Sequence, residues 1–324
     1  MNQKATEVLA RAKHACRTLS SGSAYPTGSD SETRKFIRYW FDDYARVQLA
    51  ALSIAISRVR DETTRDVLWC GFSRLIITKS AGASLAMDLS HSRPHKKFAT
   101  APVKPFNRFI AAVDAVISNC PKSGSGRIGP RAVVKHGDAR KLQIESKSID
   151  LVLTSPPYLN AIDYMRCSKF SLVWMGYNVD ELRMIRGDSV GAEASSQVAM
   201  ASPWVQSLIM QLGLKSKLSS RDSGLLSRYV LDMGGALSEV SRVLRADGRA
   251  VYVVGDSTVR GTFVRNSAIV EAVAQMHGLV LDDKKSRALP ANRRYLPPPK
   301  KGADSAIEGR MRREVVLAFS KPIA

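Results

Sequence analysis

The stretch Ser148-Ile149-Asp150-Leu151-Val152-Leu153-Thr154-Ser155-Pro156-Pro157-Tyr158 decides the fold and the candidate site of this chain. Its first half, 148–153, is mostly apolar and β-branched, which predicts a short buried strand. Two consecutive prolines cannot donate backbone hydrogen bonds, so the strand must end before Pro156 and leave the sheet. Ligands of open α/β sheets bind at the carboxyl ends of the strands, so 155–158 is predicted to form the lip of a pocket.

The lip motif resembles the catalytic motif of the DNA amino-methyltransferases, which methylate N4 of cytosine or N6 of adenine with S-adenosylmethionine. The longer run TSPPYLNAIDYMRCSKFSLVWMG (154–176) resembles a bacterial subgroup of site-specific DNA methyltransferases. A serine before the prolines is similar to the cytosine-N4 type, so the resemblance implies cytosine N4 in preference to adenine N6. The competing interpretation is a core strand that ends at the prolines and is followed by a packed tyrosine.

The residue types of the lip suit this chemistry. An exocyclic amine is a poor nucleophile because its lone pair is delocalised into the ring. By resemblance, the Ser155 hydroxyl and the Pro156 carbonyl accept hydrogen bonds from the amine and expose that lone pair. Pro156 and Pro157 fix the direction of the carbonyl, so little reorganisation is needed. Tyr158 would stack on the target base after it leaves the duplex.

The composition limits the classes of partner. The chain has 324 residues, which can hold two domains or one large domain with an insertion. Its net charge of +20 indicates a polyanionic partner, and we expect double-stranded DNA. We see no apolar run that could cross a membrane and no signal peptide, so we expect a cytoplasmic protein. The four cysteines are far apart and predict reduced thiols without a metal site.

The N-terminal part is predicted to be mainly helical. Apolar residues at helical spacing predict helices over 3–18, 34–60, 61–79 and 107–120. We expect residues 1–22 to form an N-terminal helix of the methyltransferase core. Residues 23–130 would then be a mainly helical insertion and the candidate DNA-recognition region.

Residues 131–324 are predicted to form the Rossmann-like catalytic core. Strands are expected at 132–136, 148–153, 249–254, 279–282 and 314–319, and helices at 228–245 and 267–278. Gly248 is the predicted C-cap of the first helix, and the last two strands would close the sheet in antiparallel fashion. The predicted class is therefore α/β, a partial Rossmann-type (class I) methyltransferase sheet with a mainly helical N-terminal region or insertion.

The cofactor site can be assigned only in part. By resemblance, the S-adenosylmethionine site includes Gly137, Asp138, Ala139 and Thr154, with Asp138 accepting the amino group of the cofactor's adenine. A surface Gly-Asp turn is the alternative. The usual glycine-rich cofactor turn is not recognisable: 124–129 fits GxGxxG by letter, but it neither follows a predicted strand nor precedes a predicted helix.

The start of the chain suggests why that turn is not found. Residues 2–13 resemble the family's segment just after the acidic residue that binds the cofactor's ribose, so the first two strands of the sheet are expected to be absent. Three explanations stay open. A separate polypeptide supplies the missing part; the start is misplaced or the gene is broken; or the sheet closes differently.

Basic residues outside the lip are candidate DNA contacts. They are Arg93, Lys96, Lys97, Arg166, Arg293, Arg294, Arg310 and Arg312. For each arginine alone, a solvated surface charge is the competing interpretation. Arg166 either contacts the phosphate of the flipped nucleotide or pairs with Asp163. Phe170 and Trp174 lie at i and i+4 on a predicted helix, so we expect them in the core.

Three functions are compatible with these patterns. The first is an S-adenosylmethionine-dependent DNA methyltransferase of a restriction–modification or solitary type. The second is a non-catalytic DNA-binding subunit or a truncated remnant of such an enzyme. The third is an RNA base amino-methyltransferase, since Pro-Pro-Tyr motifs occur there too, usually after aspartate. Cofactor binding separates the first two.

Overall fold

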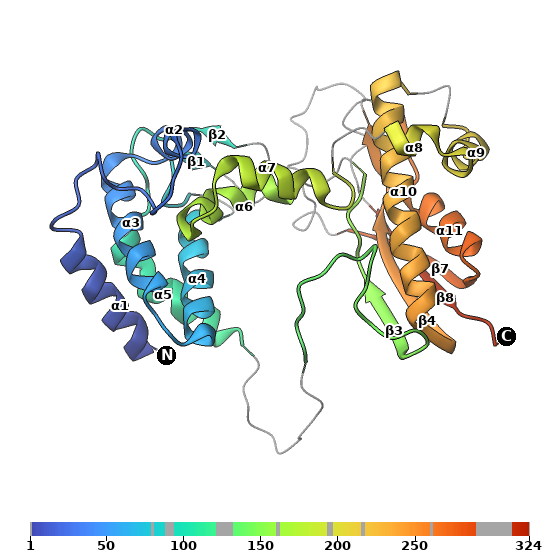
Figure 1. Ribbon diagram of the computed structural model, residues 1–324, viewed down its shortest axis with the longest axis horizontal. Coiled ribbons are helices and arrows are strands. Elements are labelled where there is room, and N and C mark those ends of the chain that lie inside the picture. The colour runs from blue at the N-terminus through green and yellow to red at the C-terminus, as the bar shows by residue number, and fades with distance from the viewer. Residues whose placement is uncertain are drawn as a thin grey trace, which may run out of the picture. The chain divides into compact units, whose positions relative to one another are not determined.

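The computed structural model describes residues 2–78, 81–87, 94–120, 132–159, 163–192, 197–214, 218–259, 262–289 and 313–323. The chain forms two compact units whose sequence segments alternate (Figure 1). Unit 1 comprises 1–130 and 164–186, and unit 2 comprises 131–163 and 187–324. Most described residues of unit 1 are helical, whereas unit 2 is built on a β-sheet.

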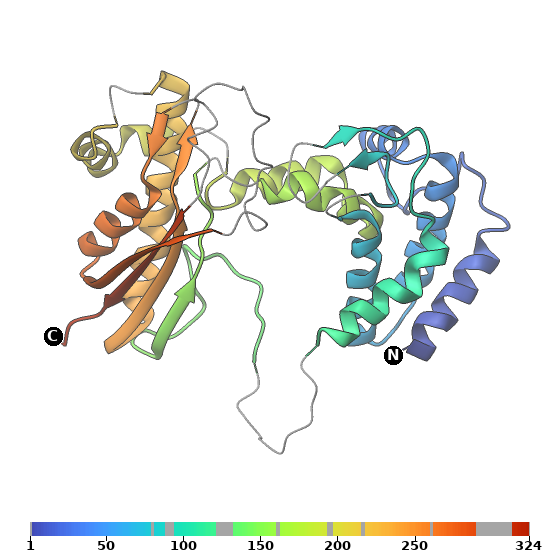
Figure 2. The ribbon, with the colours of Figure 1, turned by 180° about the vertical axis from the view of Figure 1, so that it is seen from behind.

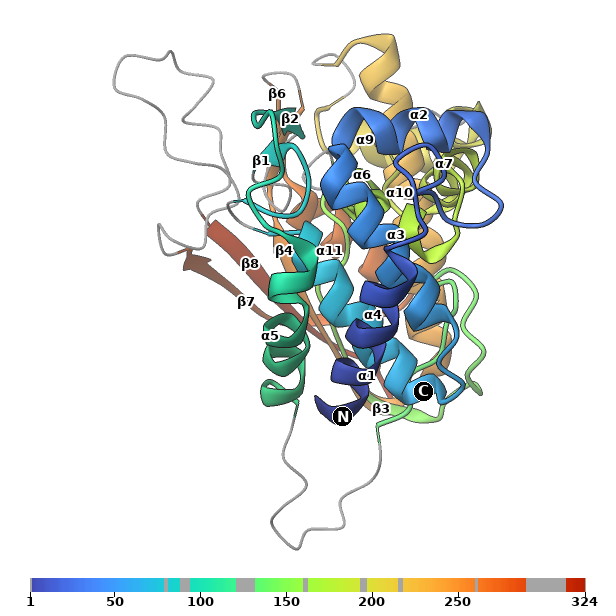
Figure 3. The ribbon, with the colours of Figure 1, turned by 90° about the vertical axis from the view of Figure 1, so that its left-hand side faces the viewer.

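Unit 1 contains the helices predicted in the N-terminal part, with one more interruption than expected (Figure 3). They are α1 (Asn2–Ala15), α2 (Ser31–Trp40), α3 (Asp43–Ser57), α4 (Glu62–Ile76) and α5 (Pro105–Ser118). A short pair, β1 (Ala86–Met87) and β2 (His95–Lys96), lies between α4 and α5. The aspartates Asp30, Asp42 and Asp61 cap α2, α3 and α4, each accepting a hydrogen bond from a first-turn backbone N–H. Asp42 is therefore the reason that 34–60 forms two helices.

The second segment of unit 1 completes its core. It contains α6 (Tyr164–Leu172), the 3₁₀ turn η1 (Val173–Met175) and most of α7 (Val179–Asp188). Phe170 and Trp174 are fully buried, as predicted, and both pack against the ring of Phe41. Ser53 on α3 donates a hydrogen bond of 2.6 Å to the Trp174 carbonyl. Unit 1 therefore needs residues on both sides of 131–163.

Unit 2 is a mixed sheet with helices. Its elements are β3 (Ile149–Thr154), α8 (Gln197–Ala201), α9 (Pro203–Gln211), α10 (Ser220–Val243), β4 (Leu244–Gly255), β5 (Ser257–Val259), β6 (Thr262–Val264), α11 (Asn266–Met276), β7 (Val280–Ala288) and β8 (Arg313–Ser320). The strand order of the main sheet is β3-β4-β8-β7 (Figure 2). β3 and β4 are parallel, and β8 is antiparallel to both of its neighbours. The α/β class and the closing antiparallel strands are thus confirmed.

One face of this sheet is buried under helices. Alternate residues of β4 and β8 point to that face, and their side chains pack with those of α10 and α11. The set is Ala250, Tyr252, Val254, Leu317 and Phe319. On α10 the buried residues repeat at helical spacing, which explains why this long segment is helical and lies on the sheet.

The other face and one edge of the sheet are open. β3 ends the strand order, and β4 is its partner strand in the described sheet. Leu151 and Leu153 point away from the helix-covered face, and they are 56% and 70% exposed. A strand that is apolar on an uncovered face and has unpaired backbone groups on one side is an uncommon arrangement in an isolated sheet.

Two local predictions in unit 2 are wrong. Residues 132–136 form no strand, and Val134 is 97% exposed, because an extended segment without a neighbouring strand has no ladder to join. The helix expected to end near Gly248 ends at Val243, since Leu244 pairs with Ile149 of β3 and begins β4. Gly248 therefore lies inside β4, and the turn there is made by Asp247 with a φ of 62°. The functional division at residues 22 and 130 stays a prediction: the compact units share the boundary after residue 130, but they have none at 22, and unit 1 also includes 164–186.

Candidate active site

The lip follows β3 at the carboxyl edge of the parallel strand pair. Thr154 is the last residue of β3 and lies beside Tyr252 of β4, so 155–158 leaves the sheet at that edge. Ser155 is exposed, while Pro156, Pro157 and Tyr158 are half-buried. The predicted strand and its end at the prolines are confirmed, but its predicted burial is wrong, because no described element covers Leu151 and Leu153. The described residues form an open ledge here, with the hydroxyl of Ser155 on its outer side.

A line of hydrogen bonds runs inward from Ser155. Its Oγ lies 3.0 Å from the Tyr158 hydroxyl. That hydroxyl also lies 3.3 Å from the Val253 carbonyl and 3.4 Å from Oε1 of Glu314 on β8. Arg287 on β7 donates two hydrogen bonds, of 3.0 and 2.8 Å, to Oε2 of Glu314. Ser155 is thus connected through Tyr158 to a carboxylate that is only 9% exposed.

Glu314 and Arg287 were not predicted from the sequence as site residues. Glu314 is 156 residues from Tyr158, and no motif joins them. The available signal is an acidic residue in REVVLAFS, 313–320, whose pattern is otherwise that of a buried strand. A buried carboxylate needs a hydrogen-bond or ion-pair partner. An acidic residue within a buried-strand pattern therefore indicates a candidate site residue, as a motif does.

The second half of the lip is held from α10. The Tyr229 hydroxyl donates a hydrogen bond of 3.1 Å to the Pro157 carbonyl. Tyr229 is completely buried, and this burial raises the pKa of its hydroxyl, so it stays protonated and remains a donor. Gly191 packs beside them with a φ of 74°, and a methyl group there would meet the Cβ atom of Pro157 at 3.3 Å. Pro157 is therefore fixed on two sides.

The chain after the lip is also fastened to the sheet edge. Ser257 donates a hydrogen bond of 2.6 Å to the Leu159 carbonyl. The buried Asn266 side-chain amide donates to both the Gly255 carbonyl and the Ser257 hydroxyl. The Asp256 carboxylate accepts the Ser267 backbone N–H, which begins α11. The Gly255–Ser257 turn thus connects the segment after the lip, the end of β4 and the first turn of α11.

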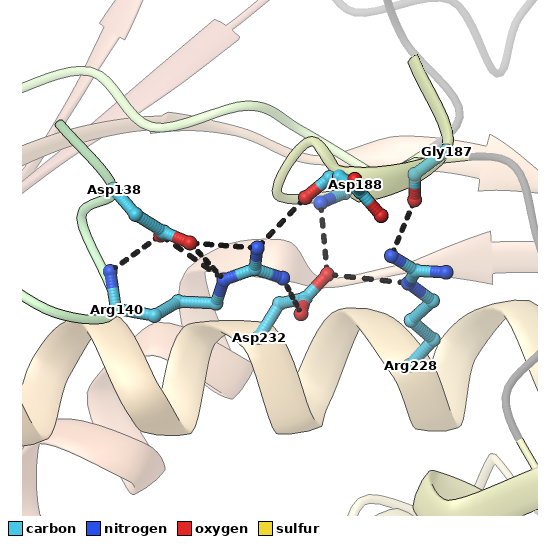
Figure 4. Close-up of polar contacts among 7 residues, drawn as sticks. Asp138, Arg140, Gly187, Asp188, Arg228 and Asp232 are labelled. Carbon is cyan, nitrogen blue, oxygen red and sulfur yellow. Dashed lines mark hydrogen bonds and ion pairs between the residues drawn. The ribbon is translucent and has the colours of Figure 1, made fainter. Parts of the chain in front are cut away.

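Asp138 lies in an ion-pair cluster, which Figure 4 shows. Both of its oxygens accept hydrogen bonds from Arg140. The same guanidinium donates 2.7 Å bonds to Oδ1 of Asp232 and to the Asp188 carbonyl. The two carboxylates raise the pKa of Arg140, the Asp138 bond most, and Arg140 lowers the pKa of Asp138. Arg140 is therefore a fixed cation between two carboxylates.

Asp232 on α10 joins this cluster to the lip. Its side chain is 7% exposed and lies between Arg140 and Arg228, whose Nε is 3.6 Å from Oδ2. Oδ2 also accepts the backbone N–H of Gly191 at 3.2 Å. Since Gly191 packs against Pro157, the charges on α10 help to position the segment beside the proline ledge.

The described residues do not form a ready site for S-adenosylmethionine. Three N–H groups of Arg140 make four contacts with the two oxygens of Asp138, so most of the acceptor capacity of this carboxylate is already used. Gly137 and Ala139 are exposed beside it, and Thr154 ends β3. The assignment of these four residues to the cofactor stays a prediction, in which an adenine amino group would compete with Arg140 for Asp138.

The structure describes three of the candidate DNA contacts. Lys96 and Lys97 are exposed, and Nζ of Lys96 lies 4.8 Å from the ring centre of Tyr39. Arg166 lies in the first turn of α6 and is half-buried. The remaining candidates lie outside the described residues; they are Arg93, Arg293, Arg294, Arg310 and Arg312. Their contact with DNA stays a prediction.

The described residues contain neither a disulfide nor a metal cluster. The thiols of Cys16, Cys70, Cys120 and Cys167 are free, and within the described ranges no three His, Cys, Asp or Glu side chains come together as a metal site. None of the described helices combines the length and the apolar character needed to span a bilayer. A cavity of about 830 Å³ between α9, β6 and α11 is lined by residues other than those of the lip.

Comparison with known proteins found partial structural likeness alone. No protein-family model matches the chain, and no curated protein matches it. A proposed DNA modification methylase from Thermus thermophilus is 19% identical over 58% of this chain and 53% of its own, with a TM-score of 0.31. The same methylase complexed with S-adenosyl-L-methionine gives 18% identity over 58% and 54%, with a TM-score of 0.30. The chain thus spans about half the length of these methylases, and its fold is defined by its own strand order and register.

Proposed function

We propose that this protein methylates the exocyclic amine of a base in double-stranded DNA, with cytosine N4 preferred to adenine N6. The observation that carries the proposal is the hydrogen-bond line from Ser155 through Tyr158 to Glu314, at the carboxyl edge of a parallel strand pair. S-adenosylmethionine is the proposed methyl donor, and it would supply an electrophilic methyl group. The residues of this chain would bind and orient the amine that accepts it.

Glu314 determines which group donates and which accepts in each hydrogen bond between it, Tyr158 and Ser155. A carboxylate can only accept, so the Tyr158 proton is directed to Glu314 or to the Val253 carbonyl. The Tyr158 oxygen can then accept the proton of Ser155. This leaves the lone pairs of Ser155 Oγ for an N–H of the target amine, which is the role that the chemistry requires.

The ledge is rigid enough for this task. Tyr229 and Gly191 hold Pro157, and the proline rings restrict the backbone that carries the Pro156 carbonyl. A second acceptor with a fixed direction would hold the other N–H of the amine without reorganisation. The Tyr158 ring is half-buried and anchored through its hydroxyl, so it would present a fixed face to a base swung out of the duplex.

Methyl transfer to a DNA duplex is the direct test. The substitution Ser155→Ala should lower the rate by about 10²-fold, the order found when one preorganised hydrogen-bonding group is removed from a site. Ser148→Ala is a matched control beside the other end of β3, where the hydroxyl donates to the nearby Glu145 carbonyl. Transfer of labelled methyl that is unchanged in Ser155→Ala would contradict the proposal. Identification of the methylated base would decide between cytosine N4 and adenine N6.

We further propose that a separate polypeptide completes the cofactor site. The open edge of β3, with the exposed Leu151 and Leu153, is a surface onto which further parallel strands and a covering helix would fit. The occupied acceptors of Asp138 are consistent with a site that is not formed by this chain alone. Such a partner would be an α/β segment that carries the glycine-rich turn for S-adenosylmethionine.

Calorimetry can separate these possibilities. S-adenosylmethionine should bind the complex isolated from the native cells and not the isolated chain. The double substitution Leu151→Lys with Leu153→Lys should abolish the complex, because each lysine would have to be buried without a partner. Val280→Lys, at the exposed start of β7 on the other edge of the sheet, is the control. Full cofactor affinity in the isolated chain would contradict the partner proposal.

A non-catalytic DNA-binding subunit is the second candidate, because Arg140 occupies Asp138. DNA binding without any affinity for S-adenosylmethionine, in the chain and in its native complex, would favour it.

A further inference from the structure

Unit 1 contains a groove that none of the candidate DNA contacts lines. Its volume is about 410 Å³, and it lies between one face of α1 and the turn that joins α3 to α4. Residues 4, 7, 8 and 11 of α1 repeat at helical spacing and form one wall, while 58–61 and 64 form the other. The buried side chains of Val8 and Val59 are the apolar part of its lining.

The groove is basic because its cations outnumber its carboxylates. Its lining carries the four cations Lys4, Arg11, Arg58 and Arg60 and the two carboxylates Glu7 and Asp61. Lys4 pairs with Glu7 at 2.8 Å, and its hydrogen bond lowers the pKa of that carboxylate. Asp61 accepts the Thr64 backbone N–H at 2.7 Å as the cap of α4.

Three guanidinium groups remain available. Arg11, Arg58 and Arg60 are exposed, and none of their guanidinium groups makes a hydrogen bond or ion pair with a described residue. They come from two separate elements and line the same groove. A planar guanidinium offers two parallel N–H donors, which match the spacing of two phosphate oxygens better than a single ammonium does.

We propose that this groove binds the sugar–phosphate backbone of double-stranded DNA. The identity of the polymer rests on the proposed function, whereas the site rests on the lining. The arginines would contact phosphates, and the apolar floor is suited to the sugar. The net charge of +20 favours a polyanion, and a chain of phosphates can engage all three arginines at once.

The test is the salt dependence of DNA binding, measured by fluorescence anisotropy with a labelled duplex. In the triple variant Arg11→Gln, Arg58→Gln, Arg60→Gln, the slope of log affinity against log salt should become shallower by about 2 to 3, since each phosphate contact contributes about 0.9. The affinity at moderate salt should fall by at least about tenfold. The chain alone is sufficient for this measurement.

A second triple variant has the same change in charge. Arg38, Arg74 and Arg108 are exposed on α2, α4 and α5 of the same unit and do not line the groove. Their change to glutamine should alter the salt slope by less than about 1. Equal losses in the two variants, or wild-type binding in the groove variant, would overturn the proposal.

Competition with polyglutamate separates phosphate recognition from general attraction to anions. If polyglutamate displaces the duplex equally well at equal charge concentration, the groove is not a phosphate site. The outcome is independent of catalysis: groove-dependent DNA binding without methyl transfer would leave this site intact and contradict the proposed enzyme.

Discussion

Tyr158 has two parts that act differently, a half-buried ring that packs against the core of unit 2 and a hydroxyl that joins Ser155 to Glu314. Tyr158→Phe keeps the ring, so DNA affinity should be retained while methyl transfer falls by about tenfold, which is the value of about one hydrogen bond. Tyr158→Ala should lower the rate of methyl transfer further, because base stacking on an aromatic ring is worth about 1–3 kcal/mol. Single-turnover rates and duplex affinities of both variants check this. Equal losses of transfer and of binding in Tyr158→Phe would contradict it.

Glu314 is predicted to act through Tyr158 and not through the fold. Glu314→Gln keeps the shape but offers both a donor and an acceptor, so the direction of the hydrogen-bond line is lost. The rate at saturating DNA should fall by about tenfold with an unchanged KM. The unfolding temperature should change little, because the partner Arg287 is 63% exposed and water can solvate it. A rate equal to that of the wild type would contradict the directional role.

At the scale of elements, Asp232 connects α10 to the segments on either side of β3. Asp232→Asn removes the charge between Arg140 and Arg228, and the free energy of unfolding should fall by about 2 kcal/mol. Asp150→Asn is the control, since its pair with Arg245 is exposed on both sides and its loss should cost less than about 0.5 kcal/mol. Denaturant titration measures both. Equal changes would mean that the cluster does not stabilise unit 2.

Glu239 makes the same helix sensitive to acid. Its carboxylate accepts the Leu142 N–H at 2.7 Å and pairs with Arg242, whose hydrogen bond lowers the pKa of Glu239 to about 2. A lowered carboxylate pKa stabilises the folded state above the ordinary value near 4.5, and this stabilisation is lost as the pH falls toward 2. The stability difference between the wild type and Glu239→Gln should therefore be largest near pH 7 and shrink during acid titration. A difference that is constant with pH would contradict this.

At the scale of the whole molecule, the chain passes between the units at 130/131, 163/164 and 186/187. Neither unit is a continuous segment. The fragment 1–130 lacks Phe170 and Trp174, two fully buried side chains of unit 1, so it should not fold cooperatively. Joining 1–130 to 164–186 through a flexible linker should restore a cooperative thermal transition, followed by circular dichroism. Cooperative unfolding of 1–130 alone would contradict the assignment of 164–186 to this core.

The sequence by itself determined the features that depend on near neighbours. The apolar, β-branched run and the prolines of 148–158 predicted β3 and its end, and helical spacing predicted α1, α4, α5 and α11. Phe170 and Trp174 were assigned to the core because they lie one turn apart. These elements and core positions depend on backbone geometry and on the periodicity of apolar side chains, and both are set within a few residues.

The tertiary structure alone decided what depends on pairing between distant segments. Leu244 is a strand residue because it pairs with Ile149 of β3. Residues 132–136 form no strand because no described strand pairs with them. Tyr158 is hydrogen-bonded to Glu314, which lies 156 positions away in the sequence. Arg140 is hydrogen-bonded to Asp232, which lies 92 positions away. No local pattern records such contacts, since a hydrogen bond or ion pair depends on position in space and is independent of the length of chain between its two ends.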